Sequence, residues 1–277
     1  MKNKTIIITG ASDGIGLEAA RQLHAQGANV VIIGRSPEKT QAAAEELGVP
    51  YYIADFSKLD EVRSLASLLK KSYPRIDVLV NNAGGVFGYR EVTVDGFEKT
   101  MQVNHLAHFL LTNLLMGILV DSKATIINTS SVANSLLSDF NINDLNMEKK
   151  HTANKAYGNA KLENILFTKE LDRRYAANGI SAVSFHPGAV ATNFASESKG
   201  LFKFLYQGPL KKLTGLITPA QGADTLVWLA TTEPGKDWTT GEYYVKRKIT
   251  KAIDAAYDPR LAASLWSQSS VMARIDC

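Results

Sequence analysis

Tyr157 and Lys161, in the stretch KAYGNAKLEN, are four residues apart. On a helix this spacing stacks the two side chains on one face, within reach of each other. A tyrosine has a pKa of about 10 and is a poor acid or base at neutral pH, unless a nearby cation stabilises the phenolate. The pair could therefore transfer a proton, or it could be two surface residues that share a helix face by chance. The spacing alone favours the second interpretation.

A cluster of glycines in TGASDGIGLEAA follows the apolar run TIIIT near the start of the chain. Gly10, Gly14 and Gly16 fall in the predicted turn between a strand and a helix, where missing side chains let the backbone approach a ligand. The N-terminus of the following helix offers free N–H groups and a partial positive charge, which suit a diphosphate. A tight turn without a ligand is the alternative, but the position between the first strand and the first helix favours a dinucleotide-binding loop.

The ends of the next two predicted strands hold residues that could select the nucleotide. An acid at the end of the second strand would bind the ribose 2′-hydroxyl, but this chain has IIGRSPEK there, with no acid before Glu38. Gly34 leaves space, and Arg35 could pair with a 2′-phosphate or could be a solvated arginine. Asp55, in IADFS, could accept a hydrogen bond from the adenine amino group or cap the helix that follows it.

Short apolar strands alternate with helical segments along the chain, and these elements must position the residues above. The strands are uniformly apolar, which is typical of a parallel sheet covered by helices on both faces. Such alternation predicts a doubly wound α/β fold. Residues 1–277 are predicted to form a single domain, and residues 194–218, which interrupt the rhythm, a substrate loop or lid. The predicted strands are 5–9, 28–33, 50–54, 76–80, 125–130, 180–185 and 241–245.

Composition and charge narrow the possible functions. The 277 residues are 45% hydrophobic with a formal net charge of +4, and the basic residues are interleaved with acids. Solvated surface is therefore favoured over a nucleic-acid site or an anionic membrane footprint. One cysteine, Cys277, excludes a disulfide within the chain. The N-terminus leaves no room for a signal peptide, and FLLTNLLMGILV is too short to span a bilayer, so a buried helix and a cytoplasmic protein are expected.

Three motifs, TG-x-x-x-G-I-G, N-N-A-G and Y-x-x-x-K, resemble in their order and separation those of the classical short-chain dehydrogenase/reductase family. The stretches MQVNHLAHFLLTNLL, AKLENILFTKEL and SFHPGAVAT are similar to the retinol dehydrogenase-like branch of that family. The resemblance covers nearly the whole chain. It implies a Rossmann-type domain with a seven-stranded parallel sheet and hydride transfer that depends on NAD(P)(H).

The resemblance favours the chemical interpretation of the tyrosine and lysine pair. It implies that Tyr157 is the general acid/base, and that Lys161 lowers the pKa of this tyrosine and binds the nicotinamide ribose. It also implies a serine after the fifth strand that polarises the carbonyl; the asparagine-x-x-serine spacing in IINTSSVAN favours Ser131, with Ser130 as the alternative. Asn104, in MQVNHL, corresponds to the helix asparagine of the family, which holds a water linked to the lysine in a proton relay, or it is a structural helix amide.

The expected cofactor is NADP(H), with NAD(H) as the alternative. Arg35 favours the phosphorylated form, whereas Asp13, inside the glycine motif, argues against it because its charge would repel a phosphate. The backbone around Pro187, Gly188 and Val190 is expected to meet the carboxamide. The predicted cofactor-binding residues are Gly10, Ser12, Asp13, Gly14, Ile15, Gly16, Arg35, Asp55, Phe56, Asn81, Ala83, Gly84, Tyr157, Lys161, Pro187, Gly188, Val190 and Thr192.

The sequence therefore predicts an NADP(H)-preferring oxidoreductase that interconverts an alcohol and a carbonyl on a small lipophilic or aromatic substrate. A reductase of carbon–carbon double bonds is the alternative, and a dinucleotide-sensing protein without turnover is less favoured because Tyr157 and Lys161 are both present. His105 and His108 share a helix face but lack a carboxylate cluster, so no metal is expected. The family resemblance makes a homodimer or homotetramer possible, paired through the helices that carry Asn104 and Tyr157, but the long excursion after Ser131 could block or reshape that contact. No nucleic-acid partner is expected.

Overall fold

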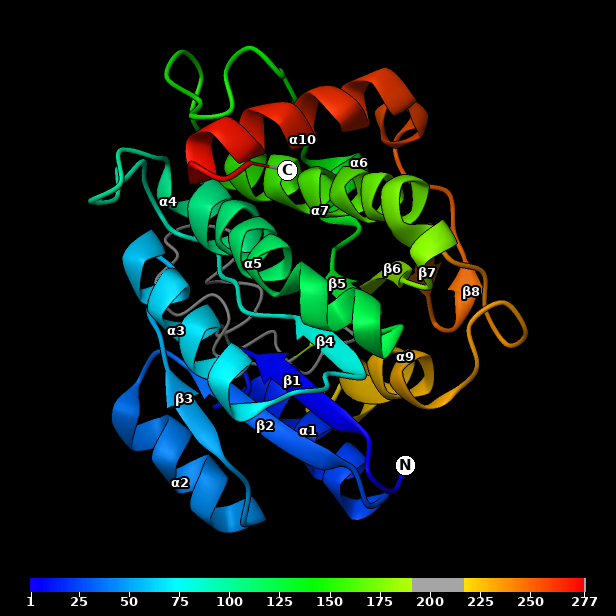
Figure 1. The fold of residues 1–277 in the computed structure, drawn as a ribbon. Coiled ribbons are helices and arrows are strands. Elements are labelled where there is room, and N and C mark those ends of the chain that lie inside the picture. Colours follow the sequence, from blue (N-terminus) through cyan, green and yellow to red (C-terminus); the bar gives the residue numbers. More distant parts are fainter. Residues whose placement is uncertain (191–216, 277) are drawn as a thin grey trace.

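A parallel sheet runs through the protein, with its strands in the order β3-β2-β1-β4-β5-β6-β7-β8 (Figure 1). The computed structural model describes residues 1–190 and 217–276, and these strands lie within them. β1 to β7 pair in parallel with their neighbours, and β8 pairs antiparallel with β7. The bounds are β1 (Thr5–Thr9), β2 (Asn29–Gly34), β3 (Tyr51–Ile53), β4 (Val78–Asn81), β5 (Thr125–Thr129), β6 (Ser181–His186), β7 (Tyr243–Val245) and β8 (Lys248–Ile249).

This strand order confirms the doubly wound α/β fold. The seven parallel strands that the sequence predicts are β1 to β7, but the prediction missed β8. A two-residue turn, Lys246 and Arg247, joins β7 to β8, and both residues have positive φ, 50° and 61°. Such turns usually carry asparagine and glycine, so this one gives no sequence signal. Of the predicted lid, only Ile217 and Thr218 belong to the described residues.

Helices cover both faces of the sheet, as Figure 1 shows. On one face lie α3, α5 and α7, and on the other lie α1, α2 and α9. A π-helical turn, Gln102–Leu106, joins α4 to α5. The helix bounds are α1 (Gly14–Ala25), α2 (Pro37–Leu47), α3 (Leu59–Ser72), α4 (Lys99–Met101), α5 (Ala107–Ser122), α6 (Ala133–Leu136), α7 (Ala153–Tyr175), α9 (Pro219–Thr231) and α10 (Pro259–Ala273).

The central strands are buried on both faces because successive side chains point to opposite layers. Ile7 of β1 packs in the core that contains α3 and α5, whereas Ile6 and Ile8 pack in the core that contains α1 and α9. None of the three isoleucines is exposed. This two-sided burial explains why the strands read as continuous apolar runs.

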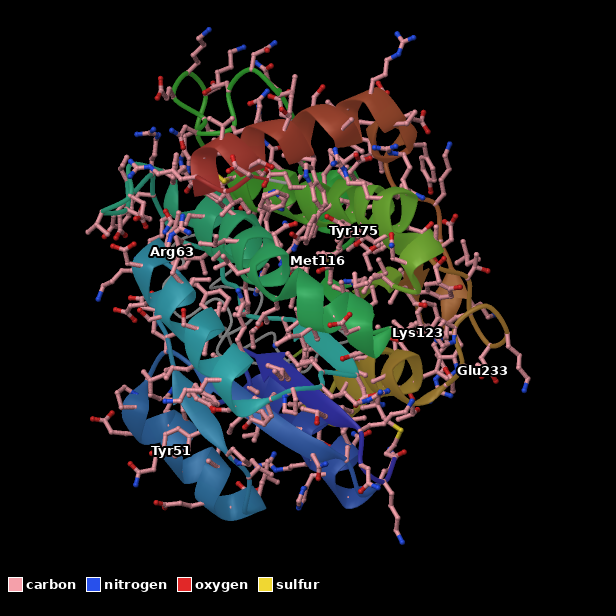
Figure 2. All side chains as sticks on the ribbon, in the orientation of Figure 1. Tyr51, Arg63, Met116, Lys123, Tyr175 and Glu233 are labelled. Atoms are coloured by element: carbon pink, nitrogen blue, oxygen red, sulfur yellow. The ribbon has the colours of Figure 1, made fainter. Side chains whose placement is uncertain are left out.

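α10 forms a further layer over α5 and α7. The ring centroid of Trp266 lies 5.0 Å from that of Phe109 on α5 and 5.7 Å from that of Phe167 on α7. Tyr175, which Figure 2 labels, lies with its ring centroid 6.1 Å from Trp266. The guanidinium of Arg174 lies 4.5 Å from the centroid of the Trp266 ring. α10 therefore covers part of α5 and α7, the helices that could pair between subunits. The oligomeric state stays a prediction.

The helical segment 99–122 is long and apolar enough to cross a membrane by length and composition, with a mean hydropathy of 1.5 in its best window. However, 67% of that window is buried inside the protein, and it is the one such segment among the described residues. Phe109, Leu111 and Leu115 are fully buried within the core. The segment has the burial of a core helix, as the sequence predicted.

Trp266→Ala is expected to lower the free energy of unfolding by about 3–5 kcal/mol, because it removes the aromatic group that joins α10 to α5 and α7. Val271→Ala on the same helix is the matched control, since Val271 is 76% exposed and its truncation should change stability by less than about 0.5 kcal/mol. Urea unfolding of both variants measures the difference. Equal effects of the two substitutions would show that α10 contributes little to the core.

Candidate active site

The residues that could do chemistry gather at the carboxyl edge of the sheet. β1, β4, β5 and β6 are parallel neighbours, so the loops that follow them emerge at the same edge. These loops carry the glycine motif, the NNAGG segment, two serines and the HPG segment, while α7 carries Tyr157 and Lys161. In an open α/β sheet this edge is where ligands bind, next to the point where the strand order reverses.

The glycine loop between β1 and α1 packs so closely that side chains do not fit. Gly10 has a φ of 63°, and a Cβ there would lie 2.7 Å from the Cα of Ala83. A Cβ on Gly16 would collide with the carbonyl oxygen of Gly10. Gly14, with a φ of 58°, begins α1, whose first N–H groups have no partner within the helix. The loop therefore has the form of a cradle for an anion at a helix N-terminus.

Asp13 caps the N-terminus of α1, which gives the acid inside the glycine motif a structural role. Its Oδ1 accepts a hydrogen bond of 2.7 Å from the N–H of Gly14. An aspartate at this position stabilises a helix through the bond and through the helix dipole. The same charge lies next to the predicted phosphate site, so it bears on which cofactor binds.

The two asparagines of the NNAGG segment point in different directions. Asn81, which the sequence predicts at the cofactor site, directs its side chain into the core, where Nδ2 donates to Thr112 Oγ1 at 3.0 Å and to Asn128 Oδ1 at 2.8 Å. Asn82, which the prediction omitted, donates from Nδ2 to the carbonyl oxygen of Thr9 at 2.9 Å and to that of Gly10 at 3.2 Å. Asn82 therefore holds the glycine loop, and the alternation of side chains along a strand end is the signal that could have found it.

The end of β2 lies against the glycine loop. A Cβ on Gly34 would lie 3.1 Å from Ser12 Oγ and would collide with Thr40 Oγ1, so glycine is required at this contact. Ser12 and Gly34 thus lie next to each other, and the assignment of Ser12 and Arg35 to the adenosine end of a cofactor stays a prediction. Ser36 then caps α2 by accepting from the N–H of Lys39.

Asp55 and Phe56, after β3, have partners within the protein. Asp55 Oδ1 accepts from the N–H and the hydroxyl of Ser57, at 2.9 and 2.8 Å, and so forms the turn that leads to α3. Asp55 therefore shapes the turn before α3 but does not cap that helix: the N-cap position is Lys58, which makes no side-chain cap bond, and the N–H of Leu59 donates to Asp95 instead. Phe56 is buried, and its ring centroid lies 5.1 Å from that of His108.

Tyr157 and Lys161 face each other on the inner side of α7. Both side chains are buried, and Lys161 Nζ lies 5.3 Å from the centroid of the Tyr157 ring. Nζ also donates to the carbonyl oxygen of Thr129, at the end of β5, at 3.2 Å. Burial lowers the pKa of Lys161 to about 7, because an ammonium group is disfavoured away from water. The two residues therefore form a buried pair at the ligand edge of the sheet, and not a pair on the surface.

Asn104 and Gly84 form the wall beside Lys161. A Cβ on Gly84 would collide with Asn104 Oδ1 and would lie 3.5 Å from Lys161 Nζ. The Asn104 side chain accepts from the N–H of Gly85 at 3.2 Å and donates to the carbonyl of Gly85 at 3.0 Å. The main-chain carbonyl of Asn104 accepts from Asn164 Nδ2 and is 3.1 Å from His108 Nδ1. Asn104 therefore ties the NNAGG loop to the π-helical turn with both its side chain and its backbone.

The two serines after β5 differ in what their hydroxyl groups do. Ser130 is 1% exposed and donates its hydroxyl proton to the carbonyl oxygen of Lys161 at 2.7 Å. Ser131 is 9% exposed, and its Oγ accepts from the N–H of Ala133 at 3.2 Å. Ser131 thus uses a lone pair and not its proton in this contact. Of the two serines, only Ser131 keeps a proton that could be donated to a substrate oxygen. This favours Ser131 over Ser130 as the serine that polarises the carbonyl.

The loop after β6 reaches α9 and the glycine loop. Gly188 has a φ of 94°, and a Cβ there would lie 2.6 Å from the Cδ1 of Ile217. A Cβ on Gly222 of α9 would meet Val190 and would lie 3.3 Å from Ile15 Cγ1. Ile15 and Val190, both predicted at the cofactor site, therefore approach the same glycine. Pro187 precedes Gly188 in this loop, and Thr192 lies outside the described residues.

His105 and His108 act as structural hydrogen-bonding residues. Burial lowers the pKa of His105 to about 4 and that of His108 to about 3, so both rings are neutral at pH 7. His105 Nε2 is 3.0 Å from Ser269 Oγ on α10, and His108 Nε2 is 3.1 Å from Thr9 Oγ1. His105 thus links the π-helical turn to α10, and His108 links α5 to β1.

A family model described as short chain dehydrogenase matches residues 4–200 of this chain. The chain is 38% identical to a protein of Streptomyces sp. (strain C5) named as a daunorubicin C-13 ketoreductase, DnrU, over 98% of this chain and 92% of that protein. It is 35% identical to human retinol dehydrogenase 14, over 98% of this chain and 87% of that protein.

Solved structures with the same fold support this similarity. An uncharacterized protein from Mycobacterium paratuberculosis superposes with a TM-score of 0.80 at 30% identity, covering 99% of this chain and 95% of the other. A structure titled as the RhlG/NADP active-site complex of Pseudomonas aeruginosa superposes with a TM-score of 0.69 at 26% identity, covering 88% and 94%.

Lys161→Met is expected to raise the free energy of unfolding of the cofactor-free protein near pH 6, on the order of a few kcal/mol, with a gain that shrinks as the pH rises. The folded pKa of about 7 lies below the unfolded value of 10.5. The unfolded chain therefore binds more protons between these values, and wild-type stability rises with pH there. The carbonyl of Thr129 keeps a donor, Asn164 Nδ2, in the variant. Urea unfolding between pH 6 and pH 9.5 measures both proteins, and a difference that is independent of pH would contradict the expectation.

Proposed function

We propose that this chain, which belongs to the short-chain dehydrogenase family, is an NADP(H)-preferring enzyme that uses Tyr157 as its acid/base on a small lipophilic or aromatic carbonyl or alcohol. The family model and the two relatives match most of the chain, and this similarity identifies the protein as an oxidoreductase of the alcohol/carbonyl class. The cofactor preference, the roles of individual residues and the substrate are the proposed parts. The observation that carries them is the buried ammonium of Lys161 beside the ring of Tyr157.

The glycine loop and the NNAGG loop fit a dinucleotide, because their glycines leave backbone where side chains would collide. Gly10, Gly16 and Gly84 would each meet a neighbouring atom with an added Cβ, and α1 begins within the loop. The nicotinamide of the bound cofactor supplies or accepts the hydride. The chain supplies the pocket and the proton.

Proton transfer is assigned to Tyr157. Reduction of a carbonyl requires a proton at the oxygen, and the Tyr157 hydroxyl donates it while the ammonium of Lys161 stabilises the resulting phenolate. Because burial weakens screening by water, a cation near the ring has a larger effect on the phenolate than it would have at the surface. Ser131 donates a second hydrogen bond to the same substrate oxygen, which holds the carbonyl in place.

The surroundings of Tyr157 favour an apolar substrate. Tyr157 packs in a small cluster with Val86 and Ala133, and Leu137 packs against that cluster. Leu136, on α6, is 75% exposed. Apolar side chains next to a small number of polar groups are typical of sites for lipophilic ligands. The relatives named above carry the names of retinol and daunorubicin, which is consistent with this proposal.

A carbon–carbon double-bond reductase is the second candidate, since it would use the same tyrosine and lysine. Ser131 favours carbonyl chemistry, because a hydroxyl proton directed at a substrate oxygen is needed for that reaction. A sensor without turnover would not need a buried ammonium, which lowers the stability of the cofactor-free protein.

Tyr157→Phe is expected to reduce turnover by about 10²- to 10⁴-fold, because it removes the exchangeable proton and keeps the ring. NADPH binding should be retained, since the glycine loop is unchanged. Tyr51→Phe is the control, because Tyr51 lies on the edge strand β3 (Figure 2). Nicotinamide absorbance is followed with a panel of aldehydes, ketones and enones. Near-normal turnover in Tyr157→Phe would exclude this tyrosine as the acid/base, and wild-type turnover of enones alone would support the second candidate.

Arg35→Ala is expected to weaken NADPH binding by about 10- to 100-fold and to leave NADH binding nearly unchanged. A guanidinium makes charge-assisted hydrogen bonds with a 2′-phosphate that are worth roughly 1.5–3 kcal/mol, and NADH has no such phosphate. In the wild type, NADPH should bind more tightly than NADH despite the charge of Asp13. Arg75→Ala is the matched control, because Arg75 pairs with Asp77 before β4, at the opposite edge of the sheet. Equal wild-type affinities would refute the preference, and an unchanged gap in Arg35→Ala would refute the role of Arg35 in it.

A further inference from the structure

We propose that Asn164 is a positioning residue for Lys161. Its side-chain amide donates to the Thr129 carbonyl, which also accepts from the Lys161 ammonium, and it donates at the same time to the Asn104 carbonyl. The inference rests on the function proposed above, in which Lys161 supports Tyr157. Asn164 was absent from the residues that the sequence predicted for the site. It would not touch the substrate or the cofactor, so its effect would pass through Lys161.

Asn164 belongs to the inner face of α7. It follows Tyr157 by seven residues and Lys161 by three, so the three side chains form one stripe along the helix. Asn164 is 2% exposed. A buried amide is costly unless its donors and acceptors are paired, and here Nδ2 donates twice, to the Thr129 carbonyl at 3.0 Å and to the Asn104 carbonyl at 3.1 Å.

The Thr129 carbonyl is the point at which Asn164 and Lys161 meet. Thr129 is the last residue of β5, and its oxygen accepts from Lys161 Nζ at 3.2 Å as well as from Asn164 Nδ2. Both lone pairs of this oxygen are therefore used by α7. The Asn164 amide holds the Thr129 carbonyl in one position. Because Lys161 has a flexible side chain that donates to the same carbonyl, this contact also determines the position of Nζ.

The Asn104 carbonyl is the second acceptor of the Asn164 side chain. It lies in the π-helical turn, where the regular helix ladder is interrupted. It accepts from Asn164 Nδ2, and His108 Nδ1 lies 3.1 Å away on the other side. His108 is neutral because burial lowers its pKa to about 3, and its one N–H faces either this carbonyl or Thr9 Oγ1, which is 3.1 Å from Nε2, depending on the tautomer. The Asn104 carbonyl thus has one assigned side-chain donor, Asn164, and the relay role of Asn104 stays a prediction.

A chain of buried groups holds the helix at this point. Thr168 Oγ1 donates to the Asn164 main-chain oxygen at 2.7 Å, and Asn128 Nδ2 donates to Thr168 Oγ1 at 2.9 Å. Asn81 Nδ2 then donates to Asn128 Oδ1. These bonds connect α7 to β5 and β4 beneath the site, so Asn164 is held in register with the strand whose carbonyl it contacts.

The test is a double-mutant cycle on kcat between Asn164 and Lys161. Asn164→Leu keeps the approximate size and removes both donors; we expect kcat to fall about 10- to 100-fold, the range for residues that orient a reactive group. In a Lys161→Met background the same change should have little further effect, because the lysine through which it acts is gone. The alkaline limb of the pH profile of kcat should move to lower pH in Asn164→Leu than in the wild type. In the variant the Thr129 carbonyl is no longer held by Asn164, so its hydrogen bond to the ammonium is weaker and Lys161 loses its proton more readily.

Asn159→Leu is the matched control, because Asn159 is a buried amide on the same helix that accepts instead from Ser138 and Asp139. Its effect should be additive with Lys161→Met, and the pH profile should stay in place. If Asn164→Leu does not fold, Asn164→Ser, which is too short to bridge both carbonyls, replaces it. Additive effects, or an unmoved pH profile, overturn the role of Asn164. Wild-type kcat in Lys161→Met would instead overturn the proposed function itself.

Discussion

The ammonium of Lys161 lies out of water at the ligand edge of the sheet, and the elements around it are arranged to hold it there. Burial lowers its pKa to about 7, so the charge is carried at a cost to the cofactor-free protein. The carbonyl of Thr129 at the end of β5 accepts a hydrogen bond from the ammonium, and the absence of a side chain on Gly84 leaves room for Nζ. Buried titratable groups with a strongly shifted pKa cluster at functional sites, which is why the proposed function pairs this charge with the adjacent ring of Tyr157.

The parallel sheet makes this arrangement possible because it brings distant loops to one edge. Thr9, Asn82 and Thr129 are far apart in sequence, yet Asn82 bonds to the ends of both β1 and β5. The same close approach explains the glycines, since a Cβ on Gly10 would meet the backbone of Ala83. Close packing of backbone on backbone thus requires these glycines in the fold, and in the proposed function the same loop places the N-terminus of α1, where Asp13 already accepts from the N–H of Gly14, next to the cofactor phosphates.

Motifs and alternation were sufficient to predict the doubly wound fold and the regions that meet at the site, but not the direction of each side chain. Asn81 and Asn82 are neighbours, and only the pleat of β4 decides that the first enters the core and the second holds the glycine loop. The position of α10 depends on where Trp266 finds Phe109 and Phe167, which are contacts across long stretches of sequence. The hairpin to β8 was missed because Lys246 and Arg247 adopt positive φ without the usual turn residues.

α7 shows why hydrophobic periodicity is misleading at a site of this kind. Tyr157, Lys161, Asn164 and Thr168 recur every three or four residues and form a polar stripe, which on an ordinary helix would face solvent. All four are buried, because the stripe faces the end of a sheet whose carbonyls and amides need partners. The deeper members, Asn164 and Thr168, bond to the protein itself, whereas Tyr157 lies at the end next to the loops that could hold a ligand. In the proposed function a single helix face therefore passes from structural to chemical use over three turns, so removal of a deep amide is expected to alter proton transfer at a distance.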